Sequence, residues 1–544
     1  MIRRCLSLAL ALALLVAVGA LPLQSAAPPP PPIGPGSDPA AVALDKGLME
    51  EIQKNSELMK NLRHLSDSIG PRLTGSANLE KANHWTAEVM RGYGLTNVRL
   101  EAWTIPEGWE RGPATARLLS EPHVNKPIPV ASSAWSPGTK GKVEGEVVYL
   151  KAESIKDLEK YKGKLKNAIV LMRPPSQVPK LEQIIGKSAA ERDRTKGGPG
   201  GPGGPGLRQR GDFGKRNFSE LAAFRRELSA FLAKEGAAAM LSDSGKPLGL
   251  LMTGGGWGGR GGAPGEKEGD RASATNRLPS INVAHNHYDL LYRLATNPNG
   301  PRPRMELEVS NKFIPGPVKV FNTVGELKGS EKPDEYVVVG AHLDSWDLGT
   351  GTTDNGTGTS VVLETARVLA KSPIKPKRTI VFALFSGEEQ GLHGSREFVR
   401  QHKDLLAKTS VALVHDTGTG RVRGIGTGGG RAGYVGVMER ELASLKELGV
   451  SEFTGAVGGG SDHQSFASAT VPGFMLTQDM SYYSYTHHTQ ADTFDAAIEP
   501  NLIQGAQVMA VTAMRIANLN TLLPRTAGRQ MGMGMGGRGG RGKE

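Results

Sequence analysis

The sequence predicts an α/β fold in which a mainly parallel, mixed β-sheet lies between two layers of helices. After Met305, short apolar runs rich in β-branched residues alternate with stretches of helical periodicity, which is the pattern of strands joined by helical crossovers. Acidic and imidazole side chains follow several of these runs directly. Because ligands bind beyond the carboxyl ends of the strands in such sheets, this second observation supports the same architecture.

Two segments of the chain are assigned to this α/β domain, residues 41–115 and 304–525. The first is helical to Tyr93, apart from the loop Gly70–Gly75, and then forms a strand over Asn97–Ala102. The second alternates strands with helices. Its expected strands are Tyr336–Val339, Thr379–Phe385 and Val411–Val414, and its expected helices are Gly358–Ala370, Gly394–Leu406 and Asn501–Leu519.

Residues 116–303 differ in character, and we expect them to form a separate β-rich domain inserted between those two segments. A Gly/Pro-rich run at about residues 187–216 has no hydrophobic period. Such a run cannot bury a core, so we expect it to be a disordered insert. The expected elements are the strands Val143–Leu150, Ala168–Met172 and Ala237–Leu241 and the helix Ser219–Lys234.

The two ends of the chain are expected to lie outside the folded domains. Residues 1–27 combine two arginines with an apolar run and small residues, which is typical of a secretory signal peptide. Residues 28–40 form a Pro-rich linker, and residues 526–544 form a disordered Gly/Arg tail. The single cysteine, Cys5, lies in the signal. We therefore expect a secreted or periplasmic protein without disulfides and without a membrane partner once the signal is removed.

The net charge of +12 is concentrated outside the predicted domains. Arg3 and Arg4 contribute +2, residues 186–216 contribute +5 (eight Lys/Arg, three Asp/Glu) and residues 526–544 contribute +3 (four Lys/Arg, one Glu), which leaves +2. A nearly neutral folded part argues against a nucleic-acid partner. The alternative is a tail that binds RNA or a surface through Arg529, Arg538 and Arg541.

Acidic and imidazole residues gather where the predicted strands end. Each short motif is common in surface loops, but a charge that ends a buried strand is costly unless something pairs it, and three strands end in this way. Without a cysteine in the mature chain, a metal would be held by His, Asp and Glu, which suits zinc. In chain order the residues are His342, Asp344, Asp354, Glu388, Glu389, His415, Asp416, His487 and His488.

The ligand types allow an assignment for two zinc ions that share one carboxylate. Asp354 is the expected bridge, because a carboxylate has two oxygens. We expect His342 and Asp416 to hold one ion, and Glu389 and His488 to hold the other.

Two further acids are left for other roles. Asp344 lies two residues after His342 and is expected to accept the second N–H of that ring, which fixes its tautomer. Glu388 is expected to be the general base, which takes a proton from the metal-bridging water and delivers it to the leaving amine.

Several segments resemble the co-catalytic zinc exopeptidases, the family of zinc aminopeptidases and glutamate carboxypeptidases. The loop Gly70–Gly75 resembles the N-terminal loop of this family, and Val471–Leu476 with Leu522–Arg525 is most similar to its carboxypeptidase Q branch. The segments that carry the zinc motifs occur in the family order and are Gly340–Ser345, Thr353–Gly356, Phe385–Gly391, His415-Asp416 and His487–Thr493.

The resemblance implies a three-layer α/β/α zinc-exopeptidase domain with the same ligands and the same general base. It also implies a cis peptide bond between Asp354 and Asn355. His487 stands where some relatives have a tyrosine, which implies that His487 helps to polarise the substrate carbonyl. Residues 116–303 resemble a protease-associated domain.

The expected function is therefore that of a secreted di-zinc exopeptidase that hydrolyses short peptides or dipeptides. The carboxypeptidase Q branch favours a dipeptidase or carboxypeptidase, the wider family favours an aminopeptidase, and both stay open. A non-catalytic binding module on this scaffold is the alternative from another class. A homodimer is compatible with the sequence. Ser461–His463 is expected to shape the substrate pocket or a subunit contact, or to be a plain loop.

Overall fold

A computed structural model describes residues 34–185, 218–255, 278–428, 432–455 and 460–525. These residues fall within one unit of the chain, Pro32–Glu544. The expected signal peptide, the start of the linker, the Gly/Pro insert and the Gly/Arg tail lie outside the described residues. In the ranges that are described, no helix combines the length and the apolarity needed to cross a membrane.

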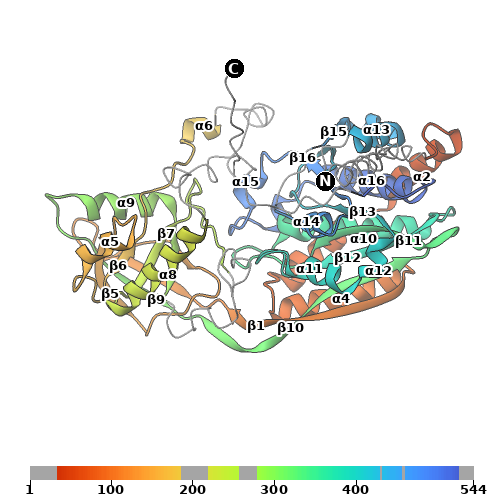
Figure 1. The fold of residues 1–544 in the computed structure, drawn as a ribbon. Coiled ribbons are helices and arrows are strands. Elements are labelled where there is room, and N and C mark those ends of the chain that lie inside the picture. Colours follow the sequence, from red (N-terminus) through yellow and green to blue (C-terminus); the bar gives the residue numbers. More distant parts are fainter. Residues whose placement is uncertain (1–33, 186–217, 256–277, 429–431, 456–459, 526–544) are drawn as a thin grey trace, which may run out of the picture. The chain divides into compact units, whose positions relative to one another are not determined.

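The first of two eight-stranded sheets is mixed and has a parallel centre. Its four central strands run parallel, β10 and β14 join them antiparallel on opposite sides, and β1 and β15 form the edges. This arrangement confirms the predicted α/β fold. In sheet order the strands are β1 (Thr96–Glu110), β10 (Lys312–Leu327), β12 (Arg378–Phe385), β11 (Lys332–His342), β13 (Thr409–Val414), β16 (Gly473–Gln478), β14 (Val422–Gly426) and β15 (Glu452–Thr454) (Figure 1).

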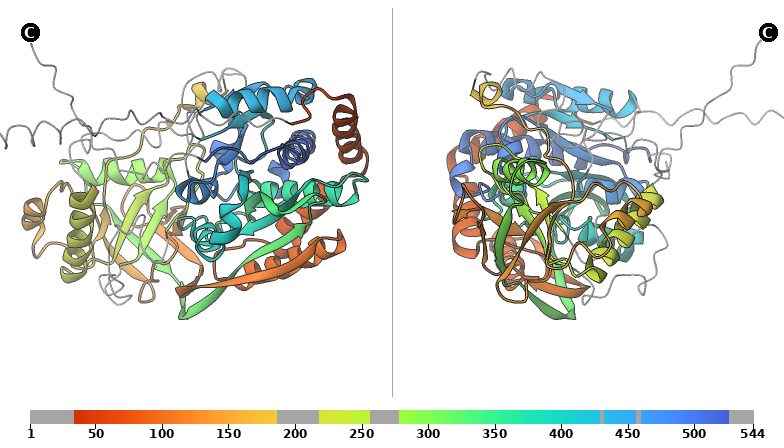
Figure 2. Two further views of the ribbon diagram at one scale, coloured as in Figure 1. Left: turned by 45° about the vertical axis from the view of Figure 1, so that its right-hand side comes forward. Right: turned by 90° about the vertical axis from the view of Figure 1, so that its left-hand side faces the viewer.

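Helices cover both faces of this sheet because its strands are apolar on both faces. In β11, Val337 and Val339 belong to one hydrophobic cluster and Val338 to another. A strand that is buried on both sides needs a helical layer on each. The first cluster includes side chains of α2 (Pro39–Asn55), α3 (Leu58–Arg63), α4 (Ala77–Gly92), α10 (Thr357–Lys371), α13 (Ala432–Glu441) and α16 (Glu499–Ala517), and the second includes those of α11 (His393–Gln401), α12 (Lys403–Ala407) and α14 (His463–Ser468). Two turned views of the ribbon show helices around the strands of this sheet (Figure 2).

Short helical turns complete this part of the chain. They are the π-helices η1 (His64–Ile69) and η6 (Thr352–Gly356), the 3₁₀-helices η7 (Ala443–Leu448) and η8 (Phe494–Ala496), and the single turn α15 (Tyr483–Thr486).

The second eight-stranded sheet lies within residues 114–309. Its centre is parallel and its edges are antiparallel. Apolar side chains of its strands and helices form two further clusters. The strands, in sheet order, are β3 (Lys126–Pro127), β2 (Ala114–Leu118), β9 (Arg304–Val309), β5 (Val143–Tyr149), β6 (Ile169–Leu171), β7 (Ala239–Asp243), β8 (Ser280–Val283) and β4 (Val130–Ser132), and the helices are α5 (Ile155–Leu158), η2 (Glu159–Tyr161), α6 (Leu181–Ile185), α8 (Phe218–Lys234) and α9 (His285–Thr296).

Among the elements that differ from their predicted bounds, β1 and the helix expected over Gly394–Leu406 show the effect of tertiary contacts. The strand expected at Asn97–Ala102 is the first part of β1, since pairing with β10 continues to Glu110, which faces Lys312. The helix expected over Gly394–Leu406 is divided into α11 and α12 at His402, whose φ of −113° and ψ of 41° are not helical. His402 Nε2 lies 2.9 Å from Glu101 Oε1 of β1, a tertiary contact that accompanies the break.

Candidate metal centre

The residues expected to bind metal come together at the carboxyl edge of the first sheet. His342 is the last residue of β11, and Asp416 follows the end of β13 by two residues. Glu389 comes shortly after β12, and Asp354 lies in η6, directly before α10. Since β11, β12 and β13 are parallel neighbours, their carboxyl ends meet at one edge and bring these side chains together.

One group of ligand atoms forms around His342. Its Nε2 lies 3.2 Å from Asp354 Oδ1 and 3.3 Å from Asp416 Oδ1. All three side chains are buried. Burial alone would lower the pKa of His342, but the surrounding carboxylates, Asp416 first among them, hold it well above its usual value. The group therefore consists of one imidazole nitrogen and two carboxylate oxygens that could hold one cation.

A second group forms around His488. Its Nε2 lies 2.9 Å from Glu389 Oε2 and 3.3 Å from Asp354 Oδ2. His488 has a φ of +61°, a left-handed conformation that is uncommon for a residue with a side chain. Asp354 thus contributes one oxygen to each group, which is the arrangement expected of a carboxylate shared by two ions.

The donor set fits zinc. Asp354 Oδ2 and Glu389 Oε1 are buried and accept no hydrogen bond from the described residues. Burial of a carboxylate without a hydrogen-bond donor is costly, so a cation is the natural partner of these oxygens. Burial also raises the pKa of Glu389 to about 7, which means that the charged form needs positive charge nearby. Imidazole and carboxylate are ligands that zinc takes readily.

Glu388 lies beside this centre and is not part of either group. Its side chain is almost completely buried, and burial raises its pKa well above the usual value. A carboxyl group whose pKa is raised in this way takes up a proton more readily than an ordinary carboxylate, which suits a general base. Its main-chain N–H donates to Asp344 Oδ1 at 3.3 Å, and that of Glu389 points to Asp344 Oδ2 at 3.4 Å.

The contacts of Asp344 differ from the sequence-based expectation. Nδ1 of His342 lies 2.9 Å from the main-chain oxygen of Asp344 and 3.5 Å from its carboxylate. Because a carbonyl oxygen can only accept, this contact places the proton on Nδ1 and leaves Nε2 for a metal. The carboxylate instead accepts a hydrogen bond from Thr74 Oγ1 at 2.9 Å and lies near the main-chain N–H groups of the Glu388–Glu389 turn.

His487 lies next to the second group. Its Nε2 is 3.8 Å from Asp354 Oδ2, and its ring stacks on that of His488 with a centroid distance of 3.6 Å. The side chain is 30% exposed, which is more than any side chain of the two groups. His487 is thus near the centre and accessible to solvent. The peptide bond between Asp354 and Asn355 is cis, as the resemblance implied.

Sequence reasoning assigned no role to Asp492 or Arg72, and both hold the loops of the centre. Asp492 accepts hydrogen bonds from the main-chain N–H groups of Thr353 and Asp354, and burial raises its pKa to about 7. Arg72 is fully buried and donates to the carbonyl oxygens of Leu343, Thr350 and Gly351. In the sequence, the only indication of these roles is that Asp492 and Arg72 lie in two segments that resemble the family, His487–Thr493 and Gly70–Gly75.

Ser461, Asp462 and His463 are buried at the start of α14. Neither carboxylate oxygen of Asp462 accepts a well-aligned hydrogen bond from the described residues. Burial raises the pKa of Asp462 to about 7, and the charges that act on it include those of His342 and Asp416. This segment is therefore part of the polar surroundings of the centre and not an exposed loop.

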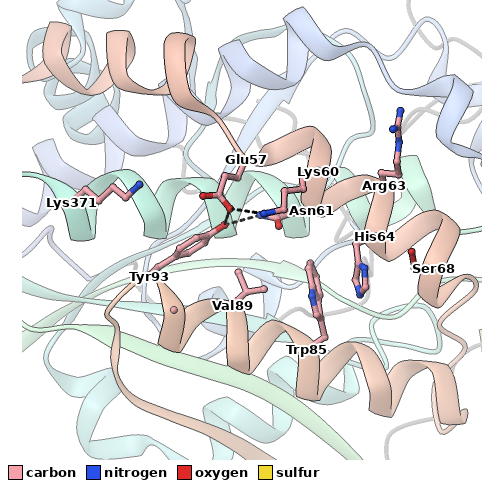
Figure 3. A pocket seen from close by; sticks show the side chains of 11 residues that line it. Glu57, Lys60, Asn61, Arg63, His64, Ser68, Trp85, Val89, Tyr93 and Lys371 are labelled. Carbon is pink, nitrogen blue, oxygen red and sulfur yellow. Dashed lines mark hydrogen bonds and ion pairs between the residues drawn. The ribbon is translucent and has the colours of Figure 1, made fainter.

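A surface cavity of about 590 Å³ lies elsewhere, among residues of α3, η1, α4 and α10 (Figure 3). The rings of His64 and Trp85 line it side by side, tilted by 30° with their centroids 4.6 Å apart, and Asn61 Nδ2 donates to Tyr93 Oη at 2.9 Å. None of the residues of the metal centre lines this cavity.

Comparison with known proteins points to peptidases. A model of Peptidase family M28 matches residues 322–514. Carboxypeptidase Q of Pongo abelii is 29% identical over 468 residues, which cover 86% of each chain, and that of Homo sapiens is 28% identical over the same share. The crystal structure of a peptidase M28 precursor from Shewanella amazonensis is 26% identical, with a TM-score of 0.70 over 90% of this chain and 99% of that one.

A second solved structure, the zinc aminopeptidase BSAP of Bacillus subtilis, matches with a TM-score of 0.54 over 84% of this chain and 93% of that one. At 21% identity, this comparison shows that the two proteins have a similar fold.

Proposed function

We propose that the chain is a member of peptidase family M28, and that this zinc-dependent metallopeptidase, which is similar to carboxypeptidase Q, is an exported exopeptidase that uses two zinc ions. The observation that carries the proposal is the position of Asp354, whose two oxygens face two different groups of ligands. A shared carboxylate of this kind is the feature that distinguishes a two-ion centre from a single site.

In this proposal His342 and Asp416 would hold one zinc ion, Glu389 and His488 would hold the other, and Asp354 would be shared by the two. When bound, zinc supplies Lewis acidity that polarises a peptide carbonyl and lowers the pKa of water. Burial of His342, Asp354 and Asp416, the low side-chain exposure of Glu389 and His488, and two carboxylate oxygens that accept no hydrogen bond within the described residues support this assignment.

Glu388 is the proposed general base. It takes the proton of the attacking water and passes it to the nitrogen of the leaving amine, so that the peptide bond is replaced by a carboxylate and a free amine. The raised pKa of Glu388 supports this double role, because the residue must hold the proton between the two steps. His487 is proposed to contact the substrate carbonyl, because it is partly exposed beside Asp354.

The proposed substrates are dipeptides or short peptides with a free carboxyl terminus, in line with the name of the carboxypeptidase Q relatives. Export is proposed from the character of residues 1–27. The second sheet is proposed to be a protease-associated domain, in line with the sequence resemblance of residues 116–303.

A panel of dipeptides with free or blocked ends, assayed with and without a chelator, tests this function. We expect hydrolysis of peptides with a free carboxyl group, loss of hydrolysis on chelation and recovery on addition of zinc. Cleavage that requires a free amino group and tolerates a blocked carboxyl group would identify an aminopeptidase instead. Undiminished cleavage after removal of zinc, verified by elemental analysis, would contradict the metallopeptidase mechanism.

A further inference from the structure

Lys246 is a buried cation that the proposed catalytic centre does not use. The residue is 6% exposed, and its Nζ donates to the main-chain oxygen of Ser484 at 2.6 Å. Over the ranges that the structure describes, it forms no ion pair and no other hydrogen bond. An ammonium group has three donors, so two remain for another acceptor. Burial of an unpaired charge is costly, and such a group calls for an anionic partner.

The turn that carries Lys246 is held in place from both sides. It follows β7, where Asp243 accepts hydrogen bonds from the main-chain N–H groups of Gly245 at 2.9 Å and Ser176 at 2.7 Å. Gly245 has a φ of +62°, which a glycine adopts without strain. The position of the lysine is therefore fixed by the second sheet and does not depend on a flexible loop.

The residues after Lys246 run beside the segment that carries His487 and His488. The main-chain N–H of Thr253 donates to the oxygen of His488 at 3.0 Å, and Met252 forms a β-bridge with Thr489. The N–H of Leu251 donates to the side chain of Gln490 at 2.8 Å. The stretch of chain that follows β7 of the second sheet thus lies beside the segment that carries His487 and His488.

The amino group of Lys246 lies on the same side as the metal ligands. Its acceptor, Ser484, belongs to the short helix α15, and Thr486 of that helix contacts Thr353 at 2.8 Å through their hydroxyl groups. Thr353 directly precedes Asp354. Burial lowers the pKa of Lys246 to about 8, and Asp354 is the charged residue that opposes this shift.

We propose that Lys246 binds the free C-terminal carboxylate of the substrate and selects peptides whose scissile bond precedes the last residue. This inference rests on the proposed exopeptidase function and names the group that recognises the end of the chain. The metal ligands and Glu388 act on the scissile carbonyl, so the carboxylate of the following residue needs a separate cation. A lysine with two spare donors suits a carboxylate, whereas it would repel a free amine.

The test compares two substrates that differ only at the carboxyl terminus, alanyl-alanine and its C-terminal amide. The wild type should cleave the free acid with the higher kcat/KM. In Lys246→Met, we expect kcat/KM for the free acid to fall by about 10–100-fold, mainly through KM, because the charge-assisted hydrogen bond is lost. The value for the amide should stay within about twofold, and Lys246→Arg should restore part of the preference.

Lys151→Met is the matched control, since Lys151 is exposed and also belongs to the second sheet's region. Its preference for the free acid should equal that of the wild type. Calorimetry gives a readout without turnover: alanyl-alanine should bind Glu388→Gln more tightly than Glu388→Gln/Lys246→Met.

The outcomes separate this inference from the proposed function. An equal loss for acid and amide in Lys246→Met would show that the lysine only supports Ser484, and would overturn the inference. A wild type that cleaves both substrates equally well would also overturn it, with the exopeptidase function intact. A zinc-loaded wild type that cleaves neither would overturn the proposed function, and this inference with it.

Discussion

Asp354 is the residue on which the centre depends, because it contacts both groups and is itself held from behind. Burial would raise its pKa, but His342 and His488 hold the pKa well below the usual range, so the carboxylate stays charged. Asp492 fixes the main chain at this position through two N–H groups. A shared ligand must be placed accurately for two ions at once, and two hydrogen bonds to its own backbone provide that accuracy.

Glu388→Gln tests the general base. Glutamine preserves the size of the side chain but cannot take up a proton, so kcat should fall by roughly 10²–10⁴-fold. Zinc content should be unchanged, because Glu388 belongs to neither ligand group. Steady-state kinetics and elemental analysis measure the two effects. Glu439→Gln, at an exposed position, is the control; normal turnover in Glu388→Gln would assign the base elsewhere.

Much of the centre could be predicted at the residue level, since imidazole and carboxylate at strand ends are informative side chains. The contact of His342 with the main-chain oxygen of Asp344 could not, because every residue has such an oxygen. Asp492 was visible in the sequence, but its role follows from a hydrogen bond to a residue 138 positions away. Contacts of this kind depend on tertiary structure and leave no local pattern.

Among the elements, the loop Gly70–Gly75 is joined to the end of β11 by several hydrogen bonds, and the side chain of Arg72 provides a set of them. Arg72 is fully buried, and its guanidinium donates to carbonyl oxygens on both sides of the turn that follows β11. Burial lowers the pKa of Arg72 to about 10, which still leaves it charged at neutral pH. The loop and the turn are therefore expected to fold as a unit.

Arg72→Met should destabilise this unit. The substitution removes the guanidinium as a donor to four carbonyl oxygens, and the free energy of unfolding should fall by roughly 2–5 kcal/mol. Urea unfolding monitored by circular dichroism gives the change. Arg117→Met, at an exposed position of β2, should change it by less than about 0.5 kcal/mol. Equal stability of the two variants would mean that water replaces the guanidinium without cost.

The second sheet contains an ion pair whose contribution depends on pH. His285 Nδ1, at the start of α9, lies 2.9 Å from Asp243 Oδ2, at the end of β7. The hydrogen bond with Asp243 raises the pKa of His285 above 6.5. A histidine with a raised pKa in the folded state stabilises the fold fully below its unfolded pKa, and this stabilisation is lost as pH rises through the folded value.

His285→Gln should therefore lower the free energy of unfolding more at pH 6 than at pH 9, because the stabilisation decreases as pH rises through the raised pKa of His285. Urea titrations at the two pH values measure the difference. His84→Gln, at an exposed position of α4, should show no such pH dependence. If His285→Gln lowers the free energy of unfolding by the same amount at both pH values, then His285 stabilises the fold through packing and not through its charge.

Prediction was most accurate for elements whose own residues determine them. The buried strands β12 and β13 are continuous apolar runs, and α10 and α16 have clear helical periodicity. The break at His402 was not predictable, since it coincides with a contact to Glu101 of another strand. The full length of β1 was missed for a similar reason, because β10, more than 200 residues later in the chain, pairs with it.

For the whole molecule, zinc and folding should be linked. Without cations, the buried carboxylates of Asp354, Glu389 and Asp416 oppose one another, and ligands that bind the folded state raise its stability by mass action. Removal of zinc should lower the Tm by at least about 5 °C, and added zinc should restore it. His342→Ala should show a smaller zinc-dependent shift. A Tm that does not respond to zinc would mean that the fold tolerates these charges without a counter-ion.

Glu110 and Lys312 face each other where the chain leaves the first sheet and where it returns. A two-residue turn between them would close an ordinary hairpin and would keep the register of β1 and β10. Residues 111–311 could then be excised as a cassette, and Lys246 would be removed with them. The α/β domain, which carries the metal centre, and residues 111–311, which carry Lys246, could then be engineered separately. One could be exchanged while the other is kept.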